Sequence, residues 1–168
     1  PFLAGLLHQL EQACLRSGLD LLVPESYAPH TQKARVLVSS ALSGGSLVQR
    51  LEEARDRFGE RTVLALQRTA EDFFLPSPSG CGEPLSRAEL RRRMDRLRPA
   101  VFFSRELCAR YFTYMSRESG AHFVLFDDKD TLAKKLEVAR SLGISTAVAA
   151  FPEVQDALDS LGLRPSLR

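Results

Sequence analysis

Five residues of this sequence have the types and positions expected of a polar ligand site. They are Glu25, Tyr27, Arg68, Glu71 and Asp72. The first two directly follow a short apolar segment, residues 19–23, and the other three follow a second one, residues 61–66. Loops that follow buried strands carry most functional side chains in α/β proteins. We therefore predict that these residues contact a substrate or ligand through hydrogen bonds and charge.

The pair Glu71 and Asp72 could act as a general acid and base only under a strict condition. Glycoside hydrolysis needs two carboxyl groups that face each other across roughly 5–10 Å. Adjacent residues on an extended chain point to opposite faces, so these two do not form such a pair. We predict no catalytic residue in this chain. The alternative for Arg68, Glu71 and Asp72 is a local ion pair with a purely structural role.

The segments that must position these residues alternate between strand and helix patterns. Apolar runs predict parallel strands at residues 19–23, 34–39, 61–66 and 144–151. The last of these is unbroken, as expected of a strand buried on both faces. Apolar residues at helical spacing predict helices at residues 2–17, 46–58, 128–142 and 152–161. The first predicted helix has an apolar face made of Leu3, Leu6, Leu7, Leu10 and Cys14.

A different block interrupts this alternation. Residues 77–84 are rich in Pro, Gly and Ser, and Ser86 then caps a basic helix. Candidate antiparallel strands follow at residues 100–103, 111–115 and 122–126. Their alternating aromatic side chains could form a sugar-stacking wall, but cross-strand packing in a core is the preferred interpretation. The predicted division is therefore residues 1–76 as strand and helix units, 77–127 as an inserted α+β subdomain, and 128–168 as the final helix, strand, helix and tail.

Bulk composition excludes several classes of protein. The 168 residues are 44% hydrophobic and 26% charged, with a formal net charge of +2, so a dedicated nucleic-acid binder is not expected. The arginine-rich helix could bind an anionic polymer, but its acidic residues favour a solvated face. No apolar run reaches the about 20 residues of a membrane span. Three cysteines and three histidines show no ligand spacing, so we predict no metal and no cofactor.

Two blocks resemble family 18 glycoside hydrolases, in particular their spore- and peptidoglycan-associated bacterial branch. Residues 61–76, RTVLALQRTAEDFFLP, resemble the seventh barrel strand and its loop. The segments YFTYM, HFVLFDD and LAKKLEVARSLGI, within residues 111–144, resemble the return from the family's insertion into its last helix. The resemblance implies a TIM-barrel type of α/β fold, seen as its C-terminal half with about four parallel strands. The inserted α+β subdomain would lie between strand seven and helix seven. From the strand pattern alone, an open sheet remains the alternative to half of a barrel.

The same resemblance implies that the catalytic machinery is absent from this chain. The family's Asp-x-x-Asp-x-Asp-x-Glu signature, which carries the catalytic acid, does not occur here. Leu125 and Ala150 stand where the family keeps tryptophans, and the chain contains no tryptophan. A sugar ring binds largely by stacking on aromatic faces, so the central subsite would lack its platform.

Three functions follow as hypotheses. The first is a non-catalytic, family 18-like domain that binds amino-sugar polymer such as chitin or peptidoglycan, with a cell envelope or spore surface as its candidate location. The second is part of an active glycosidase whose catalytic Glu lies in a missing N-terminal half. The third is a protein-interaction scaffold. The chain starts with Pro1, so we expect a processed chain or a piece of a longer one. We also expect a missing half-barrel or a second copy to cover the strand edges.

Overall fold

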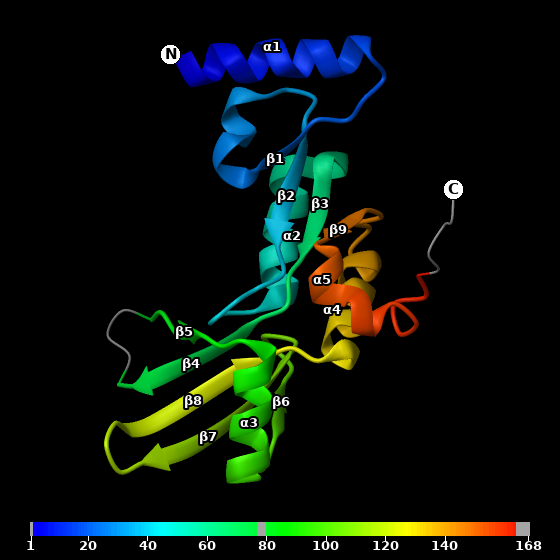
Figure 1. The fold of residues 1–168 in the computed structure, drawn as a ribbon. Coiled ribbons are helices and arrows are strands. Elements are labelled where there is room, and N and C mark those ends of the chain that lie inside the picture. Colours follow the sequence, from blue (N-terminus) through cyan, green and yellow to red (C-terminus); the bar gives the residue numbers. More distant parts are fainter. Residues whose placement is uncertain (1, 77–79, 164–168) are drawn as a thin grey trace.

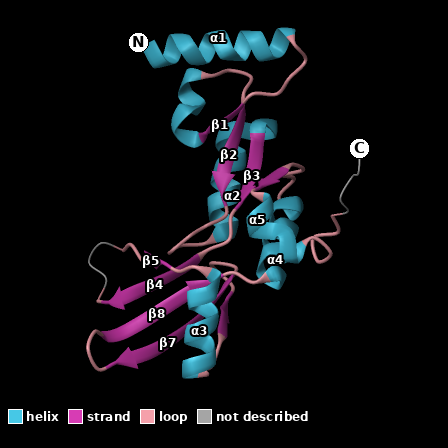
Figure 2. Ribbon diagram, in the orientation of Figure 1, coloured by secondary structure: helices cyan, strands magenta, loops and turns pink. Residues whose placement is uncertain are grey.

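The computed structural model describes residues 2–76 and 80–163. They form two units, each built on its own sheet, and the chain passes from one to the other and back (Figures 1 and 2). The first unit contains α1 (Phe2–Arg16), β1 (Leu22–Pro24), η1 (Glu25–His30), β2 (Arg35–Ser39), α2 (Leu47–Phe58), η2 (Gly59–Arg61), β3 (Thr62–Leu66), α4 (Lys129–Ser141), β9 (Ala147–Ala149), α5 (Phe151–Val154) and η3 (Gln155–Ala157). The second unit contains β4 (Ala70–Leu75), β5 (Glu83–Pro84), α3 (Arg87–Leu97), β6 (Phe102–Ser104), β7 (Ala109–Ser116) and β8 (Gly120–Phe126).

The first unit is a parallel sheet with the strand order β1-β2-β3-β9. Helices α2 and α4 bury Leu51 and Leu132 in a core that they share with Leu64 of β3. Ser46 caps α2 by accepting a hydrogen bond from the backbone N–H of Gln49, as its sequence position predicts. Asp128 caps α4 in the same way, through a capping box with Thr131. Local capping and apolar periodicity thus act together to place both helices.

The second unit is an antiparallel sheet with the order β5-β4-β8-β7-β6. Strands β7 and β8 contain the predicted antiparallel strands at residues 111–115 and 122–126, and they form a hairpin in which Phe112 lies opposite Val124. Helix α3 covers one face of this sheet, where Leu90 and Met94 pack against the cluster of Phe112, Val124 and Phe126. The aromatic side chains therefore pack as cross-strand neighbours. Tyr111 and Phe123 stack at 5.2 Å between ring centroids.

Strand β4 belongs to the antiparallel sheet although it precedes residue 77. It pairs with β8 along its whole length, from Ala70 opposite Phe126 to Leu75 opposite Ala121. The predicted boundary at residue 77 and the predicted tail after residue 163 lie outside the described residues. The first residue that pairs in the antiparallel sheet is Ala70 of β4.

The prediction that residues 144–151 form a strand buried on both faces is wrong. Only Ala147–Ala149 form strand, and all three residues are exposed. The reason is that β9 lies at the edge of the sheet and pairs only with β3. The last predicted helix is likewise shorter than expected, because α5 has four residues and continues into the 3-10 segment η3.

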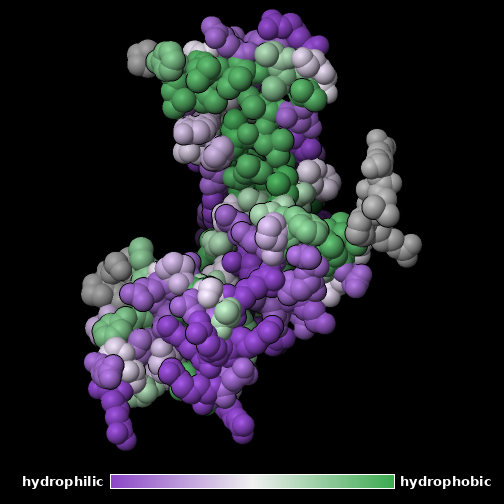
Figure 3. Space-filling view, in the orientation of Figure 1, coloured by the Kyte–Doolittle hydropathy of each residue, from purple (hydrophilic) through white to green (hydrophobic). Residues whose placement is uncertain are grey.

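Helix α1 is held to the sheet by few contacts. Of its apolar face, only Leu7 is buried, and Leu3, Leu6 and Leu10 are each more than two-fifths exposed. Figure 3 shows hydrophobic residues gathered over α1 and the adjoining part of the parallel sheet, whereas the face over α3 is mainly hydrophilic. A buried carboxylate, Glu11, anchors the helix by accepting hydrogen bonds from the backbone N–H groups of residues 32–34. No helix in the described part of the chain is long and apolar enough to cross a membrane.

Candidate functional site

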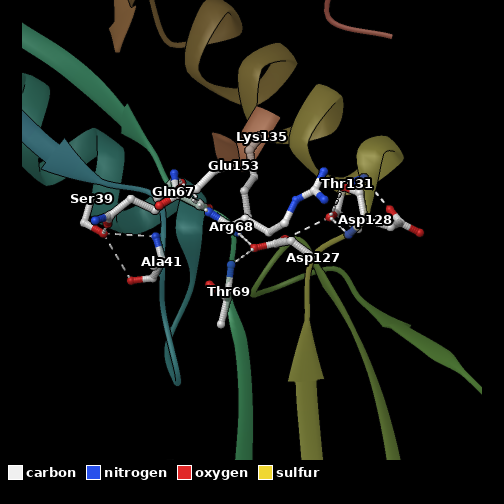
Figure 4. A network of polar contacts seen from close by, with 11 residues as sticks. Ser39, Ala41, Gln67, Arg68, Thr69, Asp127, Asp128, Thr131, Lys135 and Glu153 are labelled. Atoms are coloured by element: carbon white, nitrogen blue, oxygen red, sulfur yellow. Dashed lines mark hydrogen bonds and ion pairs between the residues drawn. The ribbon is translucent and has the colours of Figure 1, made fainter. Parts of the chain in front are cut away.

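The carboxyl edge of the parallel sheet carries most of the polar residues predicted from the sequence. All four strands run in the same direction, so the loops after β1, β2, β3 and β9 meet at one edge. The chain leaves this edge after β3 to form the antiparallel unit and returns to it before α4 (Figures 1 and 4).

Hydrogen bonds join the loops that follow β2 and β3. The Ser39 hydroxyl donates to the side-chain oxygen of Gln67 at 2.5 Å and accepts from the backbone N–H of Ala41 at 3.0 Å (Figure 4). The Ser40 hydroxyl accepts from the backbone N–H of Gln67 at 3.0 Å. These contacts fix the two loops relative to each other.

Arg68 points away from the antiparallel sheet toward the C-terminal segment. Its guanidinium contacts both carboxylate oxygens of Asp156, at 2.9 and 3.0 Å, and its backbone N–H donates to Glu153 at 3.2 Å. The hydrogen bond from Arg68 and the charge of Arg68 and Arg87 lower the pKa of Asp156, against a smaller opposing effect of burial. This carboxylate therefore stays ionised and is unsuited to act as a proton donor at neutral pH.

Glu25 and Tyr27 lie in η1, directly after β1. One carboxylate oxygen of Glu25 forms an ion pair with Arg50 of α2. The other oxygen, Oε1, is buried and has no hydrogen-bond partner among the described residues. Tyr27 is 38% exposed, so its ring is available to a ligand. This corner of the sheet edge thus combines an unsatisfied acceptor with an accessible aromatic ring.

The structure separates Arg68, Glu71 and Asp72 rather than bringing them together. Glu71 and Asp72 point to opposite faces of β4, as expected for adjacent strand residues. Asp72 is 6% exposed and binds Arg93 and His122 of the antiparallel unit. Arg68 binds Asp156 instead. The three residues do not form the local charged cluster that their spacing suggested.

A buried ion pair at the junction of the two units was missed by sequence reasoning. The carboxylate of Asp127 accepts hydrogen bonds from Lys135 at 2.7 Å, from the backbone N–H of Thr69 at 2.8 Å and from the Thr131 hydroxyl at 2.8 Å (Figure 4). The side chains of Asp127 and Lys135 are 0% and 1% exposed. The only sequence signal is the spacing of Asp127, Thr131 and Lys135 at four-residue intervals, which places them along one side of the start of α4. No group of three or more His, Cys, Asp or Glu side chains within residues 2–76 and 80–163 is arranged to hold a metal ion.

Comparison with solved structures identifies the fold. The spore cortex-lytic enzyme SleL of Bacillus megaterium QM B1551 superposes with a TM-score of 0.70 at 15% identity, over 98% of this chain and 46% of that one. A chitinase from Chromobacterium violaceum ATCC 12472 gives 0.69 at 15% identity, over 98% and 61%. A class V chitinase from Nicotiana tobaccum gives 0.61 at 14% identity, over 96% and 64%. The chain has the fold of part of a TIM-barrel-type chitinase.

The predicted α/β fold, and the predicted resemblance to family 18 enzymes at the level of the fold, are thereby confirmed. The chain spans about half to two-thirds of the length of these structures. No protein-family model and no curated protein matches the sequence.

Proposed function

We propose that this chain is a TIM-barrel-type domain that binds an amino-sugar polymer of the chitin or peptidoglycan type without hydrolysing it. Its structural neighbours are named as chitinases and a spore cortex-lytic enzyme, which supports this class of ligand. The binding residues would lie at the carboxyl edge of the parallel sheet, where barrel enzymes hold their substrates.

The non-catalytic part of the proposal is carried by the partners that the carboxylates at this edge have. Glu25 and Asp156 each form an ion pair with an arginine, and Glu153 accepts a backbone hydrogen bond. A glycosidase acid needs a carboxyl group whose pKa is raised so that it holds a proton at neutral pH. At Asp156 the opposite holds, because the hydrogen bond from Arg68 and the charges of Arg68 and Arg87 lower the pKa of this carboxyl group.

The binding part of the proposal rests on Tyr27 and Glu25. An exposed phenol ring offers a face on which a pyranose can stack, and its hydroxyl can bond the sugar. The Glu25 side chain is 29% exposed, and its carboxylate oxygen that binds Arg50 can also accept a hydrogen bond from a sugar hydroxyl or from the N–H of an N-acetyl group. Arg68, Glu71 and Asp72 were predicted as further contacts. Of these, Arg68 is the nearest along the chain to the carboxyl end of β3, from which only Gln67 separates it.

Retention on chitin beads tests these contacts. We expect Tyr27→Ala to weaken binding about tenfold, because aromatic stacking is worth roughly 0.5–1.5 kcal/mol and 1.4 kcal/mol corresponds to a factor of ten. The matched control is Phe2→Ala, which removes an aromatic ring that is 85% exposed on α1. Equal retention of wild type and Tyr27→Ala would remove Tyr27 from the site.

An active glycosidase assembled from a longer protein is the second candidate. It is favoured by the extent of the similarity, since the chain covers only 46% to 64% of the enzymes described above. The catalytic glutamic acid would then lie in an N-terminal half-barrel. Hydrolysis of a chromogenic chitobioside by the parent protein, and not by this chain, would establish this second candidate.

The edges of the parallel sheet also require a partner. Strand β9 is exposed along its length, and β1 pairs only with β2. We propose that the rest of a barrel, or a second copy of this chain, covers these edges. Sedimentation of the isolated 18.7 kDa chain distinguishes the two: a mass twice that value indicates self-association, and Val148→Lys in the exposed β9 should then restore the monomer. A chain that is monomeric alone, and whose sedimentation mass does not increase when an N-terminal half-barrel is added, would contradict both kinds of partner.

A further inference from the structure

A second group of polar side chains lies on the antiparallel sheet, away from the carboxyl edge of the parallel one. The Ser119 hydroxyl is 2.7 Å from Nε2 of His122, and Nδ1 of His122 is 3.0 Å from Oδ1 of Asp72. Ser119 stands in the turn of the β7–β8 hairpin, His122 is on β8, and Asp72 is on the neighbouring strand β4. A hydroxyl, an imidazole and a carboxylate are thus linked in series.

The carboxylate in this series is held in one orientation. The Tyr114 hydroxyl donates to Oδ2 of Asp72 at 3.0 Å, and Arg93 of α3 also binds Oδ2. Oδ1 is thereby left facing His122. Burial, together with the hydrogen bond to Asp72, raises the pKa of Tyr114, so its hydroxyl keeps its proton and remains a donor. Asp72 accordingly acts as a fixed acceptor for Nδ1–H.

The imidazole is fixed as well. The ring of Tyr114 stacks on His122 at 4.5 Å with an interplanar angle of 12°. Phe74 meets the imidazole edge-on at 5.3 Å and 87°. Two aromatic neighbours and one carboxylate therefore hold the ring with Nε2 directed at Ser119. Because Nδ1 carries the proton donated to Asp72, Nε2 is the acceptor of the serine proton.

A cavity of about 880 Å³ opens at this group. Ser119 and His122 line it, together with the aromatic ring of Phe74 and the guanidinium of Arg96. The cavity is large enough for a small acyl ester and gives the ester access to the serine. Arg96 lies on the wall of the same cavity and provides a cationic hydrogen-bond donor there.

We propose that Ser119, His122 and Asp72 form a nucleophilic triad that hydrolyses small O-acyl esters, an activity separate from polymer binding at the sheet edge. The Ser119 oxygen would attack the ester carbonyl carbon while Nε2 of His122 takes the hydroxyl proton. Collapse of the tetrahedral intermediate breaks the acyl C–O bond, and His122 returns the proton to the departing alcohol. Water, deprotonated by His122, then cleaves the acyl-serine and restores the serine, releasing the carboxylic acid. Arg96 would stabilise the negative oxygen of the intermediate.

Active-site labelling of the full 168-residue chain tests the triad. A fluorophosphonate probe should attach to Ser119, as located by mass spectrometry of the labelled peptide, and should block hydrolysis of p-nitrophenyl acetate. Ser119→Ala should reduce that hydrolysis to the rate of the buffer blank, and Asp72→Asn should lower it strongly by disturbing the imidazole. Ser141→Ala, a serine substitution on exposed α4 surface, serves as the control and should react as wild type.

Two results would overturn the proposal. The first is wild-type protein that neither binds the probe nor turns over the ester, which would mean that the Ser119 contact only stabilises the hairpin turn. The second is a label or an ester activity that persists in Ser119→Ala. Because labelling is measured on the wild-type chain, the outcome does not depend on whether any variant folds. Failure of polymer binding would leave this result unaffected.

Discussion

Asp127→Ala is expected to lower the free energy of unfolding by about 3–5 kcal/mol. The substitution leaves the ammonium group of Lys135 buried without a counter-charge, since its side chain is only 1% exposed. It also removes the acceptor for the Thr69 N–H and for the Thr131 hydroxyl. Urea unfolding followed by circular dichroism measures the change.

The double substitution Asp127→Asn with Lys135→Met is the matched control. It keeps an acceptor near Thr69 and removes the charge that would otherwise be left alone, so it should cost less than Asp127→Ala. A loss below about 1 kcal/mol for Asp127→Ala would contradict the buried pair. The expected loss is large because these side chains join the segments that enter and leave the antiparallel unit (Figure 4).

Glu11→Ala is the second change expected to have a large effect, with a loss of about 3 kcal/mol. Its carboxylate accepts hydrogen bonds from the backbone N–H groups of Gln32, Lys33 and Ala34, at 2.7 to 3.2 Å. Each buried N–H left without an acceptor costs about 1–3 kcal/mol, although such costs do not add fully. Glu52→Ala on the exposed side of α2 should change stability by less than about 0.5 kcal/mol.

The contribution of the Glu11 carboxylate to the free energy of unfolding should depend on pH. Burial acts to raise its pKa, but the three backbone donors and Arg61 outweigh burial, so that the pKa is lowered overall. A group with a lowered folded-state pKa stabilises the protein above its unfolded-state value and loses that contribution as the pH falls through the folded value. The difference between wild type and Glu11→Ala should therefore shrink between pH 7 and pH 3. A difference that stayed constant would show that the charge of Glu11 is irrelevant.

Local patterns in the sequence were sufficient to predict most of the elements. The caps at Ser46, Ser86 and Asp128 depend on contacts within one helical turn, so they can be predicted without knowing the fold. The β7–β8 hairpin depends on alternation and on Gly120, whose φ of 84° suits a turn. These predictions needed no information about distant residues.

Properties that depend on neighbours far along the chain could not be predicted in the same way. The exposure of β9 follows from its place at a sheet edge, which its own apolar sequence does not reveal. The partners of Asp72 include His122, 50 residues away, and this contact exists only because β4 pairs with β8. The five predicted site residues were chosen by their position after strands. The pairing of β4 with β8 places Asp72 beside His122 in the antiparallel unit, whereas Arg68 binds Asp156.

The most direct test of the proposed function measures binding and hydrolysis in one experiment. The chain is incubated with colloidal chitin, and both the protein retained on the polymer and the reducing ends released into solution are determined. We predict retention without release of reducing ends above the buffer blank. Release of reducing ends, or a chain that stays entirely in solution, would contradict the proposal that this domain binds amino-sugar polymer without cleaving it.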